Sequence, residues 1–335
     1  MFGFANTGWK EWRTFDGTPV LVPGGFRTEC EANGDLLLYP EGDESAPASG
    51  RMPRGGFYFD AIVRQPPIDE SRLRVEDNLE EFQPISDADI AHFERESKRL
   101  YAETDKAILA SFGGTSFGDV AFIPAPWLKR PKGIRDVEEW YISTAARKGH
   151  VFRIFEAQCG TAIRNLSRLA GAVGERATAV LVTGTDFGMQ TGTMISAETY
   201  RELFGPFHKA VNDWIHRHTT WKTFIHSCGS VAALIEDFIE AGFDILNPVQ
   251  CAATGMEAGE LKRRFGDRIT FWGGGADTQR TLPFGTPSEV AEEVRERIRV
   301  FGKGGGFVFN TIHNVQPLTP IENVLAMLRA VDEGR

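Results

Sequence analysis

Six apolar segments alternate with amphipathic segments along most of the chain, and this alternation constrains the fold more than any other feature. The apolar segments cover residues 107–111, 179–183, 222–228, 244–248, 269–273 and 306–310. Segments with helical periodicity cover residues 137–148, 149–173, 196–217, 231–241, 257–265, 287–301 and 320–332. Repeated strand–helix alternation implies a parallel sheet, either a closed (β/α)₈ barrel or a doubly wound open sheet.

Polar side chains after the strands favour the barrel. They follow each of the last five strands, and they are Asp186 and Gln190, His226 and Cys228, Asn247 and Gln250, Asp277 and Gln279, and Asn310, His313 and Gln316. In a closed barrel the carboxyl ends of all strands converge on one mouth, whereas in an open sheet they are spread along an edge. We therefore predict a (β/α)₈ TIM-like barrel. A complete barrel has eight strands, so two are missing or hidden in the N-terminal part.

The N-terminal part of the chain has a different sequence pattern. Short apolar runs at residues 18–23, 34–39 and 55–59 are separated by glycine, proline and acidic turns, which is typical of an antiparallel β-meander. Helical periodicity begins at Ile85, with Ser86-Asp87-Ala88-Asp89 as the expected helix start. We predict a β-rich appendage or insertion at residues 1–84, followed by the barrel with its site at residues 85–335.

Charge and hydropathy exclude several classes of protein. The net charge is −9 and no stripe of clustered lysine and arginine is present, which argues against nucleic-acid binding. No apolar stretch reaches the roughly 20 residues that span a bilayer, so we predict a cytoplasmic protein without a membrane segment. Four scattered cysteines form no dense disulfide framework, and reduced thiols are expected.

His226 and Cys228 lie two residues apart where an apolar strand gives way to a glycine turn. Side chains alternate along a strand, so both point the same way. With His313 from the loop after the last strand, they would hold Zn²⁺ with one coordination position open, as in a catalytic site. Cys251, in the loop after the adjacent strand, is the rival third ligand.

Further polar and glycine residues at the predicted mouth are candidates for the chemistry. Asp186 could act as an acid or base, orient a ligating histidine, or cap the following helix. We predict Asp186, Asn247 and Asp277 as catalytic residues. The run Gly273-Gly274-Gly275 lacks the spacing of a dinucleotide fingerprint and instead allows backbone and ligand to approach closely. Residues predicted to bind the cofactor are Gly273, Gly274, Gln279 and Asn310.

Residues 181–328 resemble the uroporphyrinogen decarboxylase superfamily, and within it the branch of zinc-dependent, corrinoid-linked methyltransferases. The resembling stretches are F-I-H-S-C-G-S at 224–230, D-I-L-N-P-V-Q at 244–250, F-W-G-G-G-A-D-T-Q at 271–279, and G-G-F-V-F-N-T-I-H-N, followed by T-P-I-E-N-V, within 305–324. The family's methyltransferases bind zinc through His-x-Cys and a cysteine in the last loop, a position that His313 occupies here.

The resemblance implies methyl transfer between a small methylated compound or thiol and a separate corrinoid protein, with Zn²⁺ as the bound metal. The arginine-rich N-terminal segment of the decarboxylases has no counterpart here, which disfavours porphyrinogen decarboxylation. The resemblance also suggests that the chain starts later than its relatives, in line with six strands. Two rivals remain: a metal-free decarboxylase or other lyase, and a non-catalytic small-molecule binding protein. The sequence leaves open whether the chain forms a homodimer.

Overall fold

A parallel sheet of six strands forms the centre of the computed structural model, which describes residues 8–334. Its strands are β7 (Leu109–Ala110), β8 (Ala179–Thr183), β9 (Lys222–His226), β10 (Ile245–Asn247), β11 (Thr270–Trp272) and β12 (Phe307–Val308). Each strand pairs with the next along the chain, so the sheet is wound in one direction like a barrel, without the switch point of a doubly wound sheet. Among residues 8–334, β7 and β12 are edge strands that do not pair with each other. The curled sheet is therefore a half-barrel, and the predicted TIM-like barrel with missing units is confirmed.

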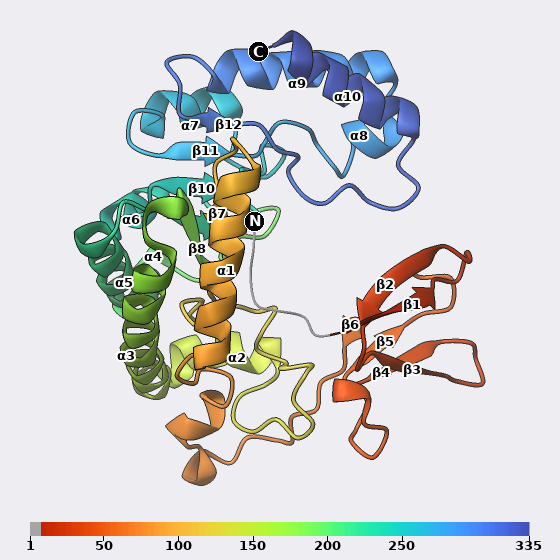
Figure 1. Ribbon diagram of the computed structural model, residues 1–335, viewed down its shortest axis with the longest axis vertical. Coiled ribbons are helices and arrows are strands. Elements are labelled where there is room, and N and C mark those ends of the chain that lie inside the picture. The colour runs from red at the N-terminus through yellow and green to blue at the C-terminus, as the bar shows by residue number, and fades with distance from the viewer. Residues whose placement is uncertain (1–7, 335) are drawn as a thin grey trace.

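Helices lie before, between and after these strands along the chain and pack around the sheet (Figure 1). They are α1 (Asp87–Glu103), α2 (Val137–Ala146), α3 (Lys148–Val173), α6 (Ile235–Glu240), α7 (Ala258–Phe265), α8 (Thr281–Phe284), α9 (Pro287–Phe301) and α10 (Ile321–Glu333). The helix predicted at 196–217 is divided into α4 (Ala197–Thr199), a π-helical turn η5 (Tyr200–Phe204) and α5 (Gly205–His218). Single π-helical turns are commonly found near functional sites.

The N-terminal part forms two antiparallel sheets of its own, apart from the half-barrel (Figure 1). One contains β1 (Trp9–Arg13) and β2 (Pro19–Pro23), and the other contains β3 (Arg27–Cys30), β4 (Leu36–Tyr39), β5 (Gly50–Met52) and β6 (Asp60–Ala61). The strand expected at 55–59 is wrong, because a glycine turn with Gly55 at φ 79° occupies that segment between β5 and β6. None of these strands joins the central sheet, so within the described residues they do not supply the two strands that a full barrel would add.

Contacts tie the appendage to loops from both edges of the half-barrel. Lys129, in the loop after β7, forms ion pairs with Asp43 at 3.0 Å and Glu41 at 3.4 Å. The hydroxyl of Tyr58 donates a hydrogen bond to Oε1 of Gln316 at 2.9 Å, in the loop after β12. The appendage thus reaches from the loop of the first strand to the loop of the last.

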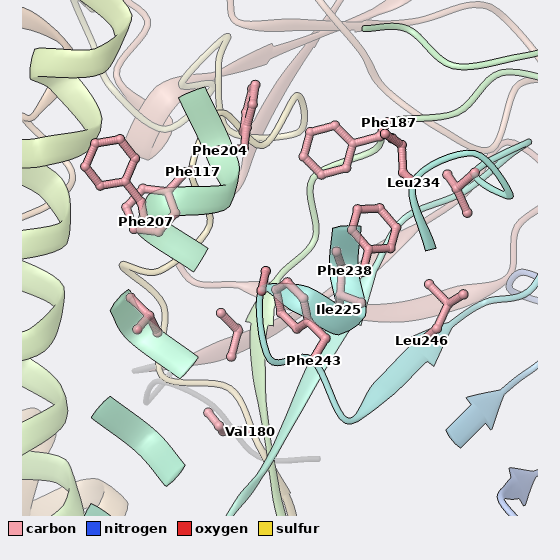
Figure 2. Packing of buried hydrophobic residues seen from close by; sticks show 14 of the residues in the cluster. Phe117, Val180, Phe187, Phe204, Phe207, Ile225, Leu234, Phe238, Phe243 and Leu246 are labelled. Atoms are coloured by element: carbon pink, nitrogen blue, oxygen red, sulfur yellow. The ribbon is translucent and has the colours of Figure 1, made fainter. Parts of the chain in front are cut away.

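The main core lies between the sheet and its helices (Figure 2). Alternate strand residues Val180, Ile225 and Leu246 face this layer and are buried. Their neighbours Ala179, Phe224 and Ile245 form a separate cluster on the opposite face. This alternation follows from the two-residue repeat of a strand. The polar candidate residues lie at or beyond the carboxyl ends of the strands, outside both apolar clusters. No helix among residues 8–334 is both long and apolar enough to cross a membrane.

Candidate metal centre

His226 and Cys228 meet at the carboxyl end of β9. The Nε2 atom of His226 lies 3.4 Å from Sγ of Cys228. In the register of the sheet, Asn247 at the end of β10 pairs with His226. The histidine is therefore held between its own strand end and that of the neighbouring strand.

Hydrogen bonds determine which ring nitrogen of His226 can bind a metal. The Nδ2 group of Asn247 donates to the carbonyl oxygen of Trp272 at 2.7 Å, so Oδ1 is the end of this amide that faces the histidine. Oδ1 accepts from Nδ1 of His226 at 2.6 Å. The neutral imidazole then carries its lone pair on Nε2, on the side of Cys228. Metal-ligating histidines commonly show this arrangement, in which the other nitrogen donates to an outer partner.

Asp186, in the loop after β8, completes a group of three candidate ligands. Its Oδ1 accepts a hydrogen bond from the backbone N–H of Cys228 at 2.7 Å. Potential ligand atoms of Asp186, His226 and Cys228 all lie within 4.8 Å of one another, and within residues 8–334 these three form the one such group. The sequence predicts Asp186 as a catalytic residue and His313 as the third ligand.

The chemistry of this donor set fits zinc. Burial, followed by the charge of Asp186 and its hydrogen bond, raises the pKa of the Cys228 thiol to about 12. Coordination to a divalent cation deprotonates a thiol and reverses that preference. Imidazole nitrogen, thiolate sulfur and carboxylate oxygen are all zinc ligands, and three protein ligands leave a position for a substrate.

Two residues that sequence reasoning missed lie beside this group. Burial and then the charge of Asp186 raise the pKa of Asp119, which follows β7. Gly184 leaves room for that carboxylate, since a Cβ there would lie 2.9 Å from Asp119 Oδ2. The Tyr141 hydroxyl donates to the backbone carbonyl of Asp186 at 2.9 Å. The available signal was an aspartate following the first strand, as Asp186 follows the second.

A cavity of about 500 Å³ opens next to Cys228. This volume is within the ordinary range for small-molecule sites. Side chains and backbone from the loops after the five strands β8 to β12 line it: Gly188, Met189, Gln190, Cys228, Gly229, Gln250, Thr278, Gln279, Ile312, His313 and Gln316. His313 and Gln279 thus line the same cavity as Cys228, although His313 is not one of the three candidate ligands that lie close together.

The other predicted site residues have local structural partners. Oδ1 of Asp277 accepts from the backbone N–H groups of Gln279 and Arg280 at 2.7 and 3.2 Å, which stabilises the turn before α8. Gly273 has φ 119°, and a Cβ there would lie 2.1 Å from the carbonyl oxygen of Pro248, so the loops after β10 and β11 require glycine at this position. The carbonyl of Asn310 accepts from the N–H of Gly275 at 2.9 Å.

Gly274 and Cys251 are neighbours in the same pair of loops. A Cβ on Gly274 would lie 3.2 Å from Sγ of Cys251. Burial raises the pKa of this thiol to about 11, and the charged groups that affect it are Arg297, Glu293 and Asp277. None of these belongs to the group of three candidate ligands.

Replacing Asn247 with alanine is expected to weaken zinc binding by about 10–100-fold, the usual cost of losing an outer partner of a ligating histidine. Nδ1 of His226 loses its acceptor at 2.6 Å, so the ring is no longer held with Nε2 toward Cys228. Competition with a chromophoric chelator measures the affinity. Asn247→Asp keeps an acceptor for Nδ1 of His226 but loses the hydrogen bond to the carbonyl of Trp272, so it should retain more affinity than the alanine variant without reaching that of the unmodified protein. Equal losses in both variants would contradict this role.

Comparison with known proteins identifies the family of this chain. The family model "Uroporphyrinogen decarboxylase (URO-D)" matches residues 144–334, more than half of the chain. The chain belongs to the uroporphyrinogen decarboxylase family. Its matched part contains the strand ends that carry Asp186, His226, Cys228 and Asn247.

Individual relatives are distant. The uroporphyrinogen decarboxylase of Coxiella burnetii (strain Dugway 5J108-111) is 33% identical over 85 residues, which cover 24% of this chain and 23% of that protein. The uroporphyrinogen decarboxylase of Magnetococcus marinus is 28% identical over 148 residues, which cover 42% of this chain and 39% of that protein. The chain thus matches less than half the length of these relatives.

A solved structure shares the fold. A methyltransferase from Methanosarcina mazei superposes with a TM-score of 0.51 at 16% sequence identity, covering 73% of this chain and 63% of that chain. At this identity the likeness concerns the fold, and it agrees with the half-barrel topology.

Proposed function

We propose that this member of the uroporphyrinogen decarboxylase family is a zinc-dependent methyltransferase of a corrinoid-linked system. It would move a methyl group between a small methylated compound or thiol and a separate corrinoid protein. The observation that carries the proposal is the group of Asp186, His226 and Cys228, whose ligand atoms lie within 4.8 Å of one another beside a cavity. We assign these three side chains as the zinc ligands, with His313, on the cavity wall, as the competing assignment from the sequence.

The residues of the chain prepare the site for an electrophilic metal. Asn247 holds the lone pair of His226 toward Cys228, and Asp186 accepts from the N–H of Cys228, so the three donors converge before any metal arrives. Zinc, when bound, supplies a Lewis acid that lowers the pKa of a thiol or polarises an ether oxygen. In this proposal the substrate enters the cavity that opens next to Cys228, with its oxygen or sulfur toward the metal.

The methyl group would then pass to the reduced corrinoid, which supplies the electron pair of the new bond. The leaving oxygen or sulfur keeps the pair of the broken bond and takes a proton from solvent. The methyltransferase named among proteins of this fold supports methyl transfer, and the thiolate and imidazole donors support zinc.

Decarboxylation is the second candidate, because the curated relatives bear that name. No lysine or arginine is among the residues that line the cavity. Carboxylates enter a pocket at high cost unless cationic or hydrogen-bonding groups pair with them. The lining therefore favours methyl transfer over the decarboxylation of a substrate with several carboxylates.

We expect the zinc-loaded protein to exchange methyl groups with cobalamin or a corrinoid protein and to leave porphyrinogens unchanged. The measurement follows the cobalamin absorbance while methylated aromatics, methylamines and thiols are offered, together with a porphyrinogen assay. Metal-free protein is the control and should be inactive. Turnover of a porphyrinogen by zinc-free protein would overturn the proposal, and silence in every assay would favour a non-catalytic binding protein.

A further inference from the structure

Four glutamines line the cavity beside Cys228, and their hydrogen bonds determine which amide groups remain available to a ligand. They are Gln190, Gln250, Gln279 and Gln316. A carboxamide can present either its oxygen or its nitrogen, so the partners of each one decide what it offers.

The orientation begins at the backbone of the loop after β9. The N–H of Gly229 donates to Oε1 of buried Gln250 at 3.0 Å, so Nε2 of Gln250 is its donating end. This Nε2 donates to Oε1 of Gln279 at 3.4 Å. The same Oε1 accepts from Nε2 of Gln190 at 3.3 Å.

This network leaves one hydrogen-bond donor and one hydrogen-bond acceptor without a partner. Nε2 of Gln279 is a donor and Oε1 of Gln190 is an acceptor, and neither has a hydrogen-bond partner within residues 8–334. Gln316 offers less, because its Oε1 accepts from Tyr58 and its Nε2 donates to the carbonyl of Asn314 at 3.0 Å. The glutamine network thus presents one oriented donor and one oriented acceptor to the cavity, whose lining also includes Thr278 and His313.

The charge at the cavity points to an uncharged ligand. Its lining contains no lysine or arginine. Zinc held by one carboxylate, one thiolate and one neutral imidazole has no net charge, so beyond its open coordination position the loaded site adds no long-range attraction for an anion. A carboxylate placed there would leave water without a cationic partner, which is unfavourable.

We propose that this cavity selects an uncharged methylated substrate whose oxygen accepts from Nε2 of Gln279 and whose hydroxyl, where present, donates to Oε1 of Gln190. Neutral methyl ethers and their alcohols or phenols fit this pattern, whereas carboxylates and sulfonates do not. The inference rests on the proposed function, because it takes the cavity beside Cys228 as the substrate site.

Calorimetry on zinc-loaded protein without cobalamin tests the proposal with 2-methoxyphenol and 2-methoxybenzoate, which have similar shape and differ in charge at pH 8. We expect 2-methoxyphenol to bind more tightly. Gln279→Leu should weaken the binding of 2-methoxyphenol by about fivefold, the contribution of one net hydrogen bond, and leave the affinity for 2-methoxybenzoate nearly unchanged. Gln279→Lys should shift the preference toward 2-methoxybenzoate by about threefold, the effect of a partly exposed ion pair. The matched control is Gln83→Lys, which adds the same charge at a residue that lines a different cavity.

Equal or tighter binding of 2-methoxybenzoate by the unmodified protein would overturn the proposal. So would an affinity ratio of the two compounds that stays unchanged in both Gln279 variants, or a protein that binds neither compound. The binding measurement is independent of turnover. If the expected ranking is found without methyl transfer to cobalamin, the proposed function fails and the selectivity stands. If methyl transfer proceeds best from anionic substrates, the selectivity fails and the proposed function stands.

Discussion

Cys228→Ser is expected to reduce bound zinc from about one ion per chain to a small fraction of that, with an affinity loss above about a hundredfold, because the variant lacks a direct ligand. The fold should persist, since Cys228 lies at the mouth of the half-barrel and is outside the buried core clusters. Metal analysis of the purified protein and a chelator titration measure the loss, and circular dichroism checks the fold. Cys30→Ser, at an exposed cysteine in the appendage, is the matched control.

The same titration identifies the third ligand. Asp186→Asn retains an acceptor for the N–H of Cys228 but removes the negative charge, so it should lower zinc affinity if Asp186 is a ligand. His313→Ala and Cys251→Ala test the two assignments made from the sequence. Loss of affinity in the Cys251 variant alone would show that both other assignments are wrong. Full zinc occupancy in Cys228→Ser would contradict the site as a whole.

Phe187→Ala is expected to destabilise the protein by about 3–5 kcal/mol, the usual cost of removing a buried phenylalanine ring. Phe187 is fully buried directly after Asp186, and its ring packs against Tyr200 at 5.3 Å, Phe204 at 5.0 Å and Phe238 at 5.9 Å between centroids. Figure 2 shows Phe187 with Phe204 and Phe238 in this cluster. Urea unfolding of the metal-free protein gives the change in free energy.

Zinc affinity should also fall in this variant, because the ring anchors the loop that presents Asp186 to Cys228. Phe284→Ala provides the control: that ring is 84% exposed, and its removal should change stability by less than about 0.5 kcal/mol. A Phe187 variant as stable as this control would show that the aromatic cluster does not hold the loop.

The strand–helix alternation and the His-x-Cys pair could be predicted because both are local. Each strand of the half-barrel is a short apolar run, and burial on two faces leaves such runs with a continuous apolar pattern. The appendage was harder to predict from local pattern. β1 and β3 are largely exposed and rich in charged residues, so they lack the apolar pattern that identifies a strand, whereas apolar residues 55–59 form a glycine turn.

By itself, the sequence determined the order of the six strands, the parallel sheet and the position of His226 and Cys228 at a strand end, because these depend on periodicity and on neighbours along the chain. Only the tertiary structure decided that the sheet stays open between β7 and β12 and that Asp186 joins the pair. It also decided that Asn247 directs Nε2 of His226 toward Cys228 and that the glutamine network leaves Gln279 as a donor. The hydrogen bonds among these features join residues that are 21 to 42 positions apart in the sequence. A local sequence pattern does not encode contacts between residues so far apart along the chain.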